Sequence, residues 1–210
     1  MERMMLIAFD LEGTLTDMVS WELLHKKFET CGLAKKNAEL FFSGRISYEE
    51  WAKLDASLWK GRRREEVEEV FKEVSLKDYA EELFRWLKEK GFKTAIITGG
   101  LMCLAKKVAE KLNPDYVYAN ELVFNEKGEI TGDVIVRVTF DNKGEILERL
   151  KRELNPTLTV AVGDWKNDLP MFEVADISIS LGEDHADYLA KDLREVKKIL
   201  KEVLLETEKL

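Results

Sequence analysis

Two carboxylates and a Gly-Thr turn follow directly after a short apolar run near the N-terminus. The run, residues 4–9, reads Met-Met-Leu-Ile-Ala-Phe, and residues 10–16 read Asp-Leu-Glu-Gly-Thr-Leu-Thr. The run predicts a buried strand. Carboxylates at the end of such a strand lose hydration unless a cation or hydrogen bonds compensate, and the carboxyl ends of strands in open α/β sheets are where ligands bind. The segment therefore predicts a nucleophilic Asp10, an assisting Glu12 and a divalent metal ion.

Length and charge limit what the chain can be. With 210 residues, the chain is long enough for one α/β domain with a sizeable core and a small insert. The formal net charge is −8, and the most basic stretch, residues 60–64, is short and followed by glutamates. This balance argues against a nucleic-acid partner. The N-terminal apolar run of about six residues is far shorter than a membrane span, so we expect no membrane association.

The two cysteines, Cys31 and Cys103, lie far apart and form no metal-binding or redox motif. This usage is typical of a reduced protein and predicts a cytoplasmic location. A monomer and a homodimer both remain compatible with the sequence.

The stretch from residue 17 to residue 74 has a helical pattern throughout. Apolar residues recur at spacings of three and four in residues 21–30, 35–42, 48–59 and 65–74, and glycines separate these segments. Ser47 and Glu50 form the pattern of a capping box at the start of the third segment. Because no strand pattern interrupts the stretch, we expect a small helical cap inserted after the first strand.

From residue 78 onward, predicted helices and strands alternate. The expected helices are residues 78–90, 101–112, 143–154, 167–175 and 192–206. The expected strands are residues 92–97, 116–119, 134–139, 159–162 and 177–180, with a hairpin formed by residues 122–124 and 129–131. Such alternation predicts a three-layer, Rossmann-like α/β fold with a mostly parallel sheet. We therefore expect an α/β catalytic core made of residues 1–16 and 75–210, and a helical cap made of residues 17–74.

Polar or acidic residues stand at the ends of three of the expected strands. They are Asp10 and Glu12 after the strand at residues 4–9, Thr98, Gly99 and Gly100 after the strand at 92–97, and Asp164 and Asp168 after the strand at 159–162. In a parallel sheet these strand ends share one edge, and the helix that begins at Lys143 starts near the same edge. Four carboxylates, a hydroxyl, an ammonium and glycine amides suit a phosphate ester held with a cation. Hard oxygen ligands of this kind select Mg²⁺.

These residues form four ordered segments that resemble the motifs of the haloacid dehalogenase superfamily. The segments are residues 10–16, Thr98, Lys143, and residues 163–168 with the sequence Gly-Asp-Trp-Lys-Asn-Asp. The resemblance covers nearly the whole chain and is closest to the phosphoserine phosphatase-like branch, whose helical cap lies between the first two motifs. It implies a Mg²⁺-dependent phosphatase that hydrolyses a small phosphorylated metabolite through an aspartyl-phosphate intermediate.

The resemblance also implies a role for each residue of the reaction. Asp10 attacks phosphorus, and Glu12 protonates the leaving oxygen and then activates water. Thr98 and the amides of Gly99 and Gly100 hold phosphate oxygens, and Lys143 neutralises developing charge. The implied metal ligands are the Asp10 side chain, the Glu12 backbone carbonyl and Asp164, with Asp168 in or next to the same shell. Asn167 orients Lys143 or the substrate.

Ordinary structural interpretations of several residues stay open at this point. The alternative for Thr98 is a helix cap, the alternative for Lys143 is a surface turn, and the alternative for Asp168 is a first-turn acid. The tryptophans at positions 21, 51 and 59 are typical of a cap core, with an aromatic substrate lid as the alternative. Trp165 lies inside the last motif, and we expect it to form a wall of the pocket.

The chain departs from the family pattern at two places. Glu12 stands where most phosphatases of this group have a second aspartate. Val19 and Asp55 align with the positions at which phosphoserine phosphatases have a glutamate for the substrate amino group and an arginine for its carboxylate. Glu22 and Arg45 lie near these positions but out of register. Because an aspartate would repel a substrate carboxylate, the identity of the phosphomonoester stays open.

Two alternative functions use the same residues. A phosphotransferase would pass the phosphoryl group from Asp10 to an acceptor alcohol instead of water. A catalytically silent protein would bind a phosphate ligand without turnover, and the glutamate at position 12 is the feature that favours it.

Overall fold

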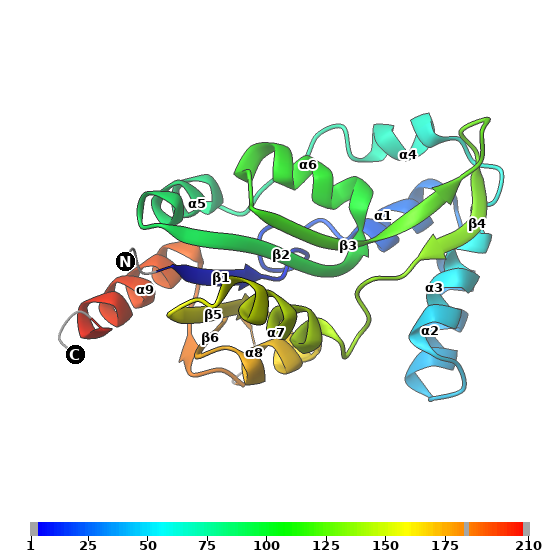
Figure 1. Cartoon of the computed structure of the whole chain (residues 1–210). Coiled ribbons are helices and arrows are strands. Elements are labelled where there is room, and N and C mark those ends of the chain that lie inside the picture. The colour runs from blue at the N-terminus through cyan, green and yellow to red at the C-terminus, as the bar shows by residue number, and fades with distance from the viewer. Residues whose placement is uncertain (1–3, 183–184, 208–210) are drawn as a thin grey trace.

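The computed structural model describes residues 4–182 and 185–207, so the ends of the predicted core range, and residues 183–184 within it, lie outside the described residues (Figure 1). The centre of the fold is a seven-stranded sheet in the order β4-β3-β2-β1-β5-β6-β7, in which every neighbouring pair is parallel except β3 and β4. The strands are β1 (Met5–Phe9), β2 (Phe92–Leu101), β3 (Tyr116–Phe124), β4 (Ile130–Ile135), β5 (Leu158–Gly163), β6 (Ile177–Ser180) and β7 (Tyr188–Leu189). The predicted α/β fold with a mostly parallel sheet is confirmed.

Strand β1 lies in the middle of the sheet, and its residues from Leu6 to Phe9 are fully buried there. A strand covered on both faces needs the continuous apolar run that the sequence supplies. Phe9 pairs with Ile96 on one side and with Val162 on the other. This register brings the residues that follow β1, β2 and β5 to the same edge of the sheet.

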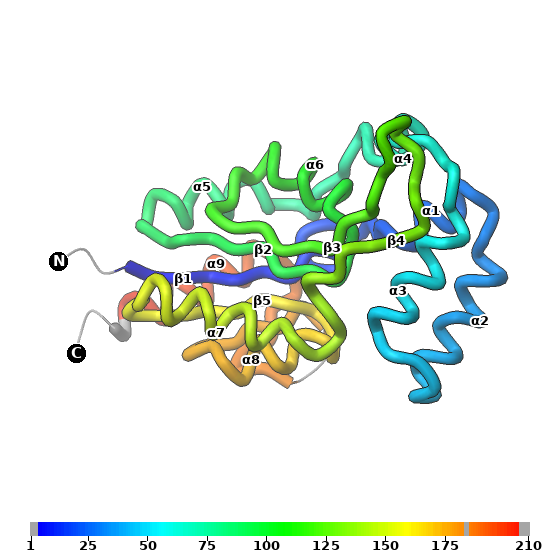
Figure 2. Tube along the Cα trace, turned by 45° about the vertical axis from the view of Figure 1, so that its right-hand side comes forward, coloured from blue at the N-terminus to red at the C-terminus, as the bar shows by residue number. Residues whose placement is uncertain are grey.

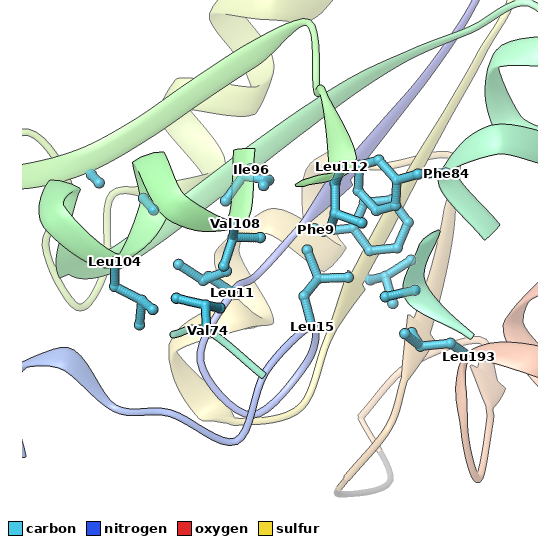
Figure 3. Close-up of a cluster of buried hydrophobic side chains, with 14 of the residues drawn as sticks. Phe9, Leu11, Leu15, Val74, Phe84, Ile96, Leu104, Val108, Leu112 and Leu193 are labelled. Carbon is cyan, nitrogen blue, oxygen red and sulfur yellow. The ribbon is translucent and has the colours of Figure 1, made fainter. Parts of the chain in front are cut away.

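Helices cover both faces of the sheet and complete the three layers (Figure 1). One face packs against α5 (Ala80–Glu89), α6 (Met102–Leu112) and α9 (Leu193–Thr207), and the other against α7 (Lys143–Leu154) and α8 (Leu169–Val174). Figure 3 shows part of the first of these cores, in which Phe9 of β1 and Ile96 of β2 meet Phe84 and Val108 of the covering helices.

The predicted helical insert contains α1 (Ser20–Lys27), α2 (Cys31–Phe42), α3 (Tyr48–Ser57) and α4 (Arg64–Val70). Helices α2 and α3 lie side by side beyond the carboxyl ends of the central strands (Figure 2). The predicted capping box is present: the Glu50 amide donates to Ser47 Oγ over 3.1 Å, and the Ser47 amide donates to Glu50 Oε2 over 2.7 Å. These two bonds satisfy amides that the first turn of α3 leaves unpaired.

The β3–β4 hairpin reaches out from the sheet and joins the helical insert (Figure 2). The Gly61 amide donates to the Ile130 carbonyl, and the Ile130 amide donates to the Arg62 carbonyl, both over 2.8 Å. Farther along, a Cβ atom on Gly132 would lie only 3.3 Å from Ser57 Cα, so the hairpin backbone packs closely on α3. The insert is therefore held to the sheet by backbone hydrogen bonds that the sequence did not predict.

Two strand predictions near the hairpin were wrong in detail. Residues 116–119 and 122–124 form the single strand β3 rather than two strands. The strand predicted at residues 134–139 is absent as such, because β4 ends at Ile135 and the next amides turn to a side chain instead of a neighbouring strand. The Arg137 and Val138 amides donate to Asn120 Oδ1 over 2.8 and 2.9 Å.

The helix predicted at residues 167–175 is also divided. A 3₁₀ helix, η1 (Lys166–Asp168), precedes α8 because the Asp168 carboxylate turns back toward the end of β5. Asp168 Oδ2 accepts hydrogen bonds from the Asp164 and Trp165 amides over 2.9 and 3.1 Å. The two-residue strand β7 was not predicted, and none of the described helices combines the length and apolar character needed to cross a bilayer.

Candidate functional site

A buried ion-pair triad lies at the carboxyl edge of the sheet. Lys143 Nζ, at the start of α7, lies 2.7 Å from Asp10 Oδ1 and 2.7 Å from Asp168 Oδ1. Lys143 and Asp168 are fully buried and Asp10 is 4% exposed. The surface-turn interpretation of Lys143 is therefore wrong, because this ammonium lies inside the protein between two carboxylates.

The electrostatics of the triad follow from burial and from the crowding of carboxylates. Burial alone would lower the pKa of the Lys143 ammonium, but the Asp10 and Asp168 carboxylates hold that pKa above its usual value. Burial raises the pKa of Asp10 well above its usual value, Lys143 opposes this rise, and repulsion from Asp168 adds to it. One ammonium does not fully compensate the negative charge gathered here.

Asp164 is the third carboxylate of the group. One oxygen of each of Asp10, Asp164 and Asp168 lies within 4.8 Å of the others. Thr14 Oγ1 donates to Asp164 Oδ1 over 3.1 Å. Burial raises the pKa of Asp164, and repulsion from Asp168 adds to the rise. A divalent cation among these oxygens would relieve both effects, and an all-oxygen donor set matches a hard ion such as Mg²⁺.

Two glycines give these carboxylates the space they occupy. A Cβ atom on Gly13 would collide with Asp164 Oδ2, and one on Gly163 would collide with Asp168 Oδ2. Gly13 also has φ of +92°, a conformation that residues with a side chain rarely adopt. The glycines of the first and last motifs are therefore required by the close approach of backbone and carboxylate.

Glu12 lies beside this group and is held by Ser20, the first residue of α1. The Ser20 amide donates to Glu12 Oε1 over 2.9 Å, and the Ser20 hydroxyl donates to the same oxygen. A side chain on Gly100 would collide with Glu12, so the longer carboxylate fits because position 100 is a glycine. Burial raises the pKa of Glu12, and the Ser20 hydrogen bonds partly oppose the rise. A raised pKa suits a carboxylic acid that must donate a proton.

The segment at the end of β2 is arranged around one hydroxyl and one carbonyl. Thr98 is buried, and its Oγ1 accepts a hydrogen bond from the Gly100 amide over 2.9 Å. The Gly99 carbonyl accepts hydrogen bonds from Trp21 Nε1, Tyr48 OH and Asn120 Nδ2 over 3.1, 3.1 and 3.0 Å. Two of these donors come from the helical insert and one from the sheet, so the conformation of this segment depends on both.

Asn120 is a functional candidate that the sequence analysis missed. This fully buried amide also donates to Val138 O over 2.8 Å, besides holding the amides of residues 137 and 138. It thereby connects the Gly99 segment to the chain that leads into Lys143. The available signal was a polar residue inside the apolar strand around it, since a buried asparagine is uncommon without bonded partners.

We expect Asn120→Asp to lower kcat for phosphate release by about 10²-fold, because a misplacement of about 1 Å at a reacting group has this order of cost. The aspartate keeps the acceptor for residues 137 and 138 but replaces the donor that holds the Gly99 carbonyl. Steady-state kinetics check this. The control is Asn125→Asp, the same change in the hairpin turn, where Oδ1 accepts two amides. An equal loss in both variants would contradict a positioning role for Asn120.

A pocket of about 570 Å³ lies between the strand ends and the helical insert. Its lining includes the predicted residues Asp10, Glu12, Thr98, Gly99, Gly100, Asp164 and Asn167. Trp21, Trp51 and Trp165 also line it, whereas Trp59 is fully buried in the core. The tryptophans predicted as one cap-core group are thus divided between core and pocket, and Trp165 forms part of the wall as expected.

The comparisons with known proteins agree with this geometry. A haloacid dehalogenase-like hydrolase family model matches residues 4–176. The chain belongs to this family. A phosphoserine phosphatase of Methanocaldococcus jannaschii is 34% identical over 206 residues, which are 93% of this chain and 97% of the relative. A phosphoserine phosphatase of Lactococcus lactis is 32% identical, with 83% of this chain and 82% of the relative covered.

Solved structures give the same result for this haloacid dehalogenase-like hydrolase. A substrate-bound phosphoserine phosphatase complex superimposes with a TM-score of 0.80 at 31% identity, covering 95% of this chain and 98% of that one. A phospho-aspartyl intermediate analogue of phosphoserine phosphatase has a TM-score of 0.80 at 32% identity, covering 92% and 97%. The predicted membership of the phosphoserine phosphatase-like branch and the expectation of a hydrolase are confirmed.

The departures from the branch pattern lie in the pocket of this hydrolase. Val19, Glu22 and Asp55 all line the pocket, whereas Arg45 is not among its described lining residues. Asp55 is buried and already partnered: Asn37 Nδ2 donates to its Oδ1 over 2.7 Å, and His25 Nε2 lies 3.3 Å from its Oδ2. The position expected to hold an arginine thus carries a carboxylate fixed in the pocket wall.

Proposed function

We propose that the protein is a Mg²⁺-dependent phosphatase that hydrolyses a small phosphomonoester through an aspartyl-phosphate on Asp10. The observation that carries this proposal is the position of Asp10, which lines the pocket while its Oδ1 accepts a hydrogen bond from the buried Lys143 ammonium. A carboxylate held by an ammonium at the floor of a pocket is oriented for attack on phosphorus.

The residues around Asp10 divide the remaining work of phosphoryl transfer. Lys143 neutralises negative charge on Asp10 and on the transferring group, and Asp168 fixes the ammonium through its second contact. The Thr98 hydroxyl and the Gly99 amide hold phosphate oxygens, and the Gly100 amide, for which the sequence predicts the same role, donates to Thr98 Oγ1 and orients that hydroxyl. Asn167, which lines the pocket near Trp165, orients the substrate.

Glu12 acts on the leaving group and on water. Its raised pKa keeps a proton available for the leaving oxygen, and the resulting carboxylate then takes a proton from the water that attacks the aspartyl-phosphate. Ser20 holds one oxygen, Oε1, and thereby orients the other. This arrangement compensates for the extra methylene that distinguishes glutamate from aspartate.

Asp10, Asp164 and the Glu12 backbone carbonyl would hold the Mg²⁺ ion, with Asp168 in or next to its shell. The bound ion supplies positive charge that lets a phosphate dianion approach several carboxylates. The cluster of mutually close carboxylate oxygens supports this assignment.

We assign residues 17–74 as the cap and residues 1–16 and 75–210 as the catalytic core. The cap covers the pocket and limits the access of water to the aspartyl-phosphate. Because the β3–β4 hairpin is bonded to the cap at Gly61, Arg62 and Arg64, we expect hairpin and cap to move as one unit.

The phosphotransferase and the silent binder are less favoured alternatives. The two relatives compared above carry the name phosphatase, and Glu12, the feature that favoured a silent binder, is held in the pocket by hydrogen bonds. A cytoplasmic location, and a monomeric or homodimeric state without nucleic-acid or membrane partners, remain predictions.

Removal of divalent metal is expected to stop phosphate release, because the repulsion among Asp10, Asp164 and Asp168 then opposes binding of a phosphate dianion. The assay measures inorganic phosphate from 4-nitrophenyl phosphate and from a panel of phosphorylated metabolites, with EDTA and then with added Mg²⁺. Recovery with Mg²⁺ is the expected result, and full activity in EDTA would contradict the metal-dependent mechanism. Loss of free phosphate on adding an acceptor alcohol would favour the phosphotransferase.

A further inference from the structure

The pocket wall beyond the reacting groups is rich in aromatic side chains. Six aromatic side chains line it: Trp21, Phe42, Tyr48, Trp51, Phe140 and Trp165. Trp51 is fixed by stacking on Phe41, with ring centroids 4.7 Å apart and planes inclined by 19°. Phe140 packs edge-on against Trp165 at 5.6 Å and against Phe42 at 6.3 Å. Rings from the insert and from the loops that follow β4 and β5 thus surround the space that the alcohol part of the substrate would occupy.

Acidic side chains accompany these rings. Two acids of the helical insert, Glu22 and Asp55, line the pocket, and Glu12 also belongs to the lining. Asp55 is 5% exposed, and Asn37 and His25 hold its carboxylate in the wall. Aromatic faces carry negative potential and attract cations, and nearby carboxylates attract cations as well. This wall therefore favours a positively charged group.

A carboxylate on the substrate would find little to bind here. Of the described residues that line the pocket, the basic ones are Lys35 and His25. Lys35 is exposed, and His25 is buried, with Nδ1 2.7 Å from Thr30 Oγ1 and Nε2 3.3 Å from Asp55 Oδ2, so this side chain faces a carboxylate of the protein itself. The buried Lys143 is committed to Asp10 and Asp168. No arginine lines the described pocket, and arginine is the side chain that pairs best with a carboxylate.

We propose that this pocket selects the phosphate monoester of a cationic amino alcohol that lacks a carboxylate, preferably one whose ammonium carries alkyl groups. This inference rests on the proposed phosphatase activity and names its substrate class. Alkyl groups on nitrogen remove hydration from the cation and bring it into contact with the rings, so that the aromatic wall contributes more. The reaction releases the amino alcohol and inorganic phosphate.

Three esters that differ in one feature at a time test this inference. Phosphoethanolamine is phosphoserine without its carboxylate, and phosphocholine is phosphoethanolamine with three methyl groups on nitrogen. We expect kcat/KM to rise from phosphoserine to phosphoethanolamine to phosphocholine, by about 10-fold between the first and the last, as expected for a desolvated cation over aromatic rings. Phenyl phosphate supplies a neutral aromatic comparison and 4-nitrophenyl phosphate a general substrate.

A variant of the wall separates substrate recognition from chemistry. In Trp51→Leu, KM for phosphocholine is expected to rise several-fold more than KM for phosphoethanolamine, with little difference in kcat between the two esters. A comparable rise for both esters would contradict recognition of the alkylated cation by the rings.

The outcomes distinguish this inference from the function on which it rests. A preference for phosphoserine would overturn the inference while phosphatase activity stands, and a preference for phenyl phosphate would overturn its cationic part. If none of the esters, including 4-nitrophenyl phosphate, releases phosphate in Mg²⁺, the proposed function itself fails.

Discussion

Asp10→Asn is expected to lower kcat by about 10³-fold or more, because an amide cannot form the aspartyl-phosphate. Asparagine preserves the shape of the side chain beside Lys143, so the change removes a nucleophile from a buried position without opening a cavity. The measurement is phosphate release under saturating substrate and Mg²⁺. Acid quenching of the wild-type enzyme during turnover, followed by mass spectrometry of the peptide that contains Asp10, is expected to detect one added phosphoryl group.

Asp17→Asn is the matched control for this substitution. Asp17 lies one residue beyond the first motif, and its side chain is 84% exposed in a surface pair with Lys77. An exposed pair contributes little to stability, so kcat and the far-ultraviolet circular dichroism spectrum are expected to match the wild type. Substantial turnover by Asp10→Asn, or phosphorylation of another residue, would contradict the assignment of the nucleophile.

The positions of the reacting groups could be predicted from sequence because they depend on local patterns. An apolar run followed at once by acids marks both β1 with Asp10 and β5 with Asp164, and parallel pairing then brings both acids to one edge. The helix that begins at Lys143 was predicted at its observed first residue. Each of these inferences needs only neighbouring residues and the general geometry of a parallel sheet.

The residues that hold this site in place depend on contacts between distant parts of the chain. Ser20 orients Glu12 and also accepts the Leu101 amide, 81 positions away. Asn120 contacts Tyr48, 72 positions away. Local sequence does not predict such partners, because a serine at a helix start and an asparagine in a strand are common without any role in a functional site.

Asp55 illustrates a further limit of sequence reasoning. The family resemblance placed Asp55 at a position expected to contact the substrate, and this residue does line the pocket. Its pairing with Asn37 and His25, which makes it a fixed part of that wall, follows only from how α1, α2 and α3 pack together. The strand expected at residues 134–139 was wrong for the same kind of reason. The amides of Arg137 and Val138 donate to the Asn120 side chain instead of to a neighbouring strand.

Lys143→Met is expected to be the most destabilising of the substitutions considered, because it leaves two buried carboxylates without their shared ammonium. Breaking a buried ion pair from one side costs about 3–5 kcal/mol, which for a chain of this size corresponds to a fall in Tm of about 6–20 °C. Methionine retains the length and apolar stem of lysine, so the loss reports charge rather than a cavity. Loss of charge neutralisation is also expected to lower kcat by about 10²-fold or more. Thermal unfolding and phosphate release measure the two effects.

The change in Tm on adding Mg²⁺ provides a second readout. This change would be the same in Lys143→Met and in the wild type if the lysine had only a structural role. Without Lys143, a cation bound among Asp10, Asp164 and Asp168 becomes the remaining positive charge, so Mg²⁺ is expected to raise Tm of Lys143→Met more than Tm of the wild type.

Lys151→Met, on the same helix, is the control. The Lys151 ammonium lies 3.5 Å from Asp176 and is partly exposed, so its removal is expected to cost about 1 kcal/mol or less. Equal losses in the two variants would mean that the buried triad contributes no more than a surface pair. A Tm of Lys143→Met that does not respond to Mg²⁺ would place the metal elsewhere, because the carboxylates around position 143 would then hold no cation next to Asp10.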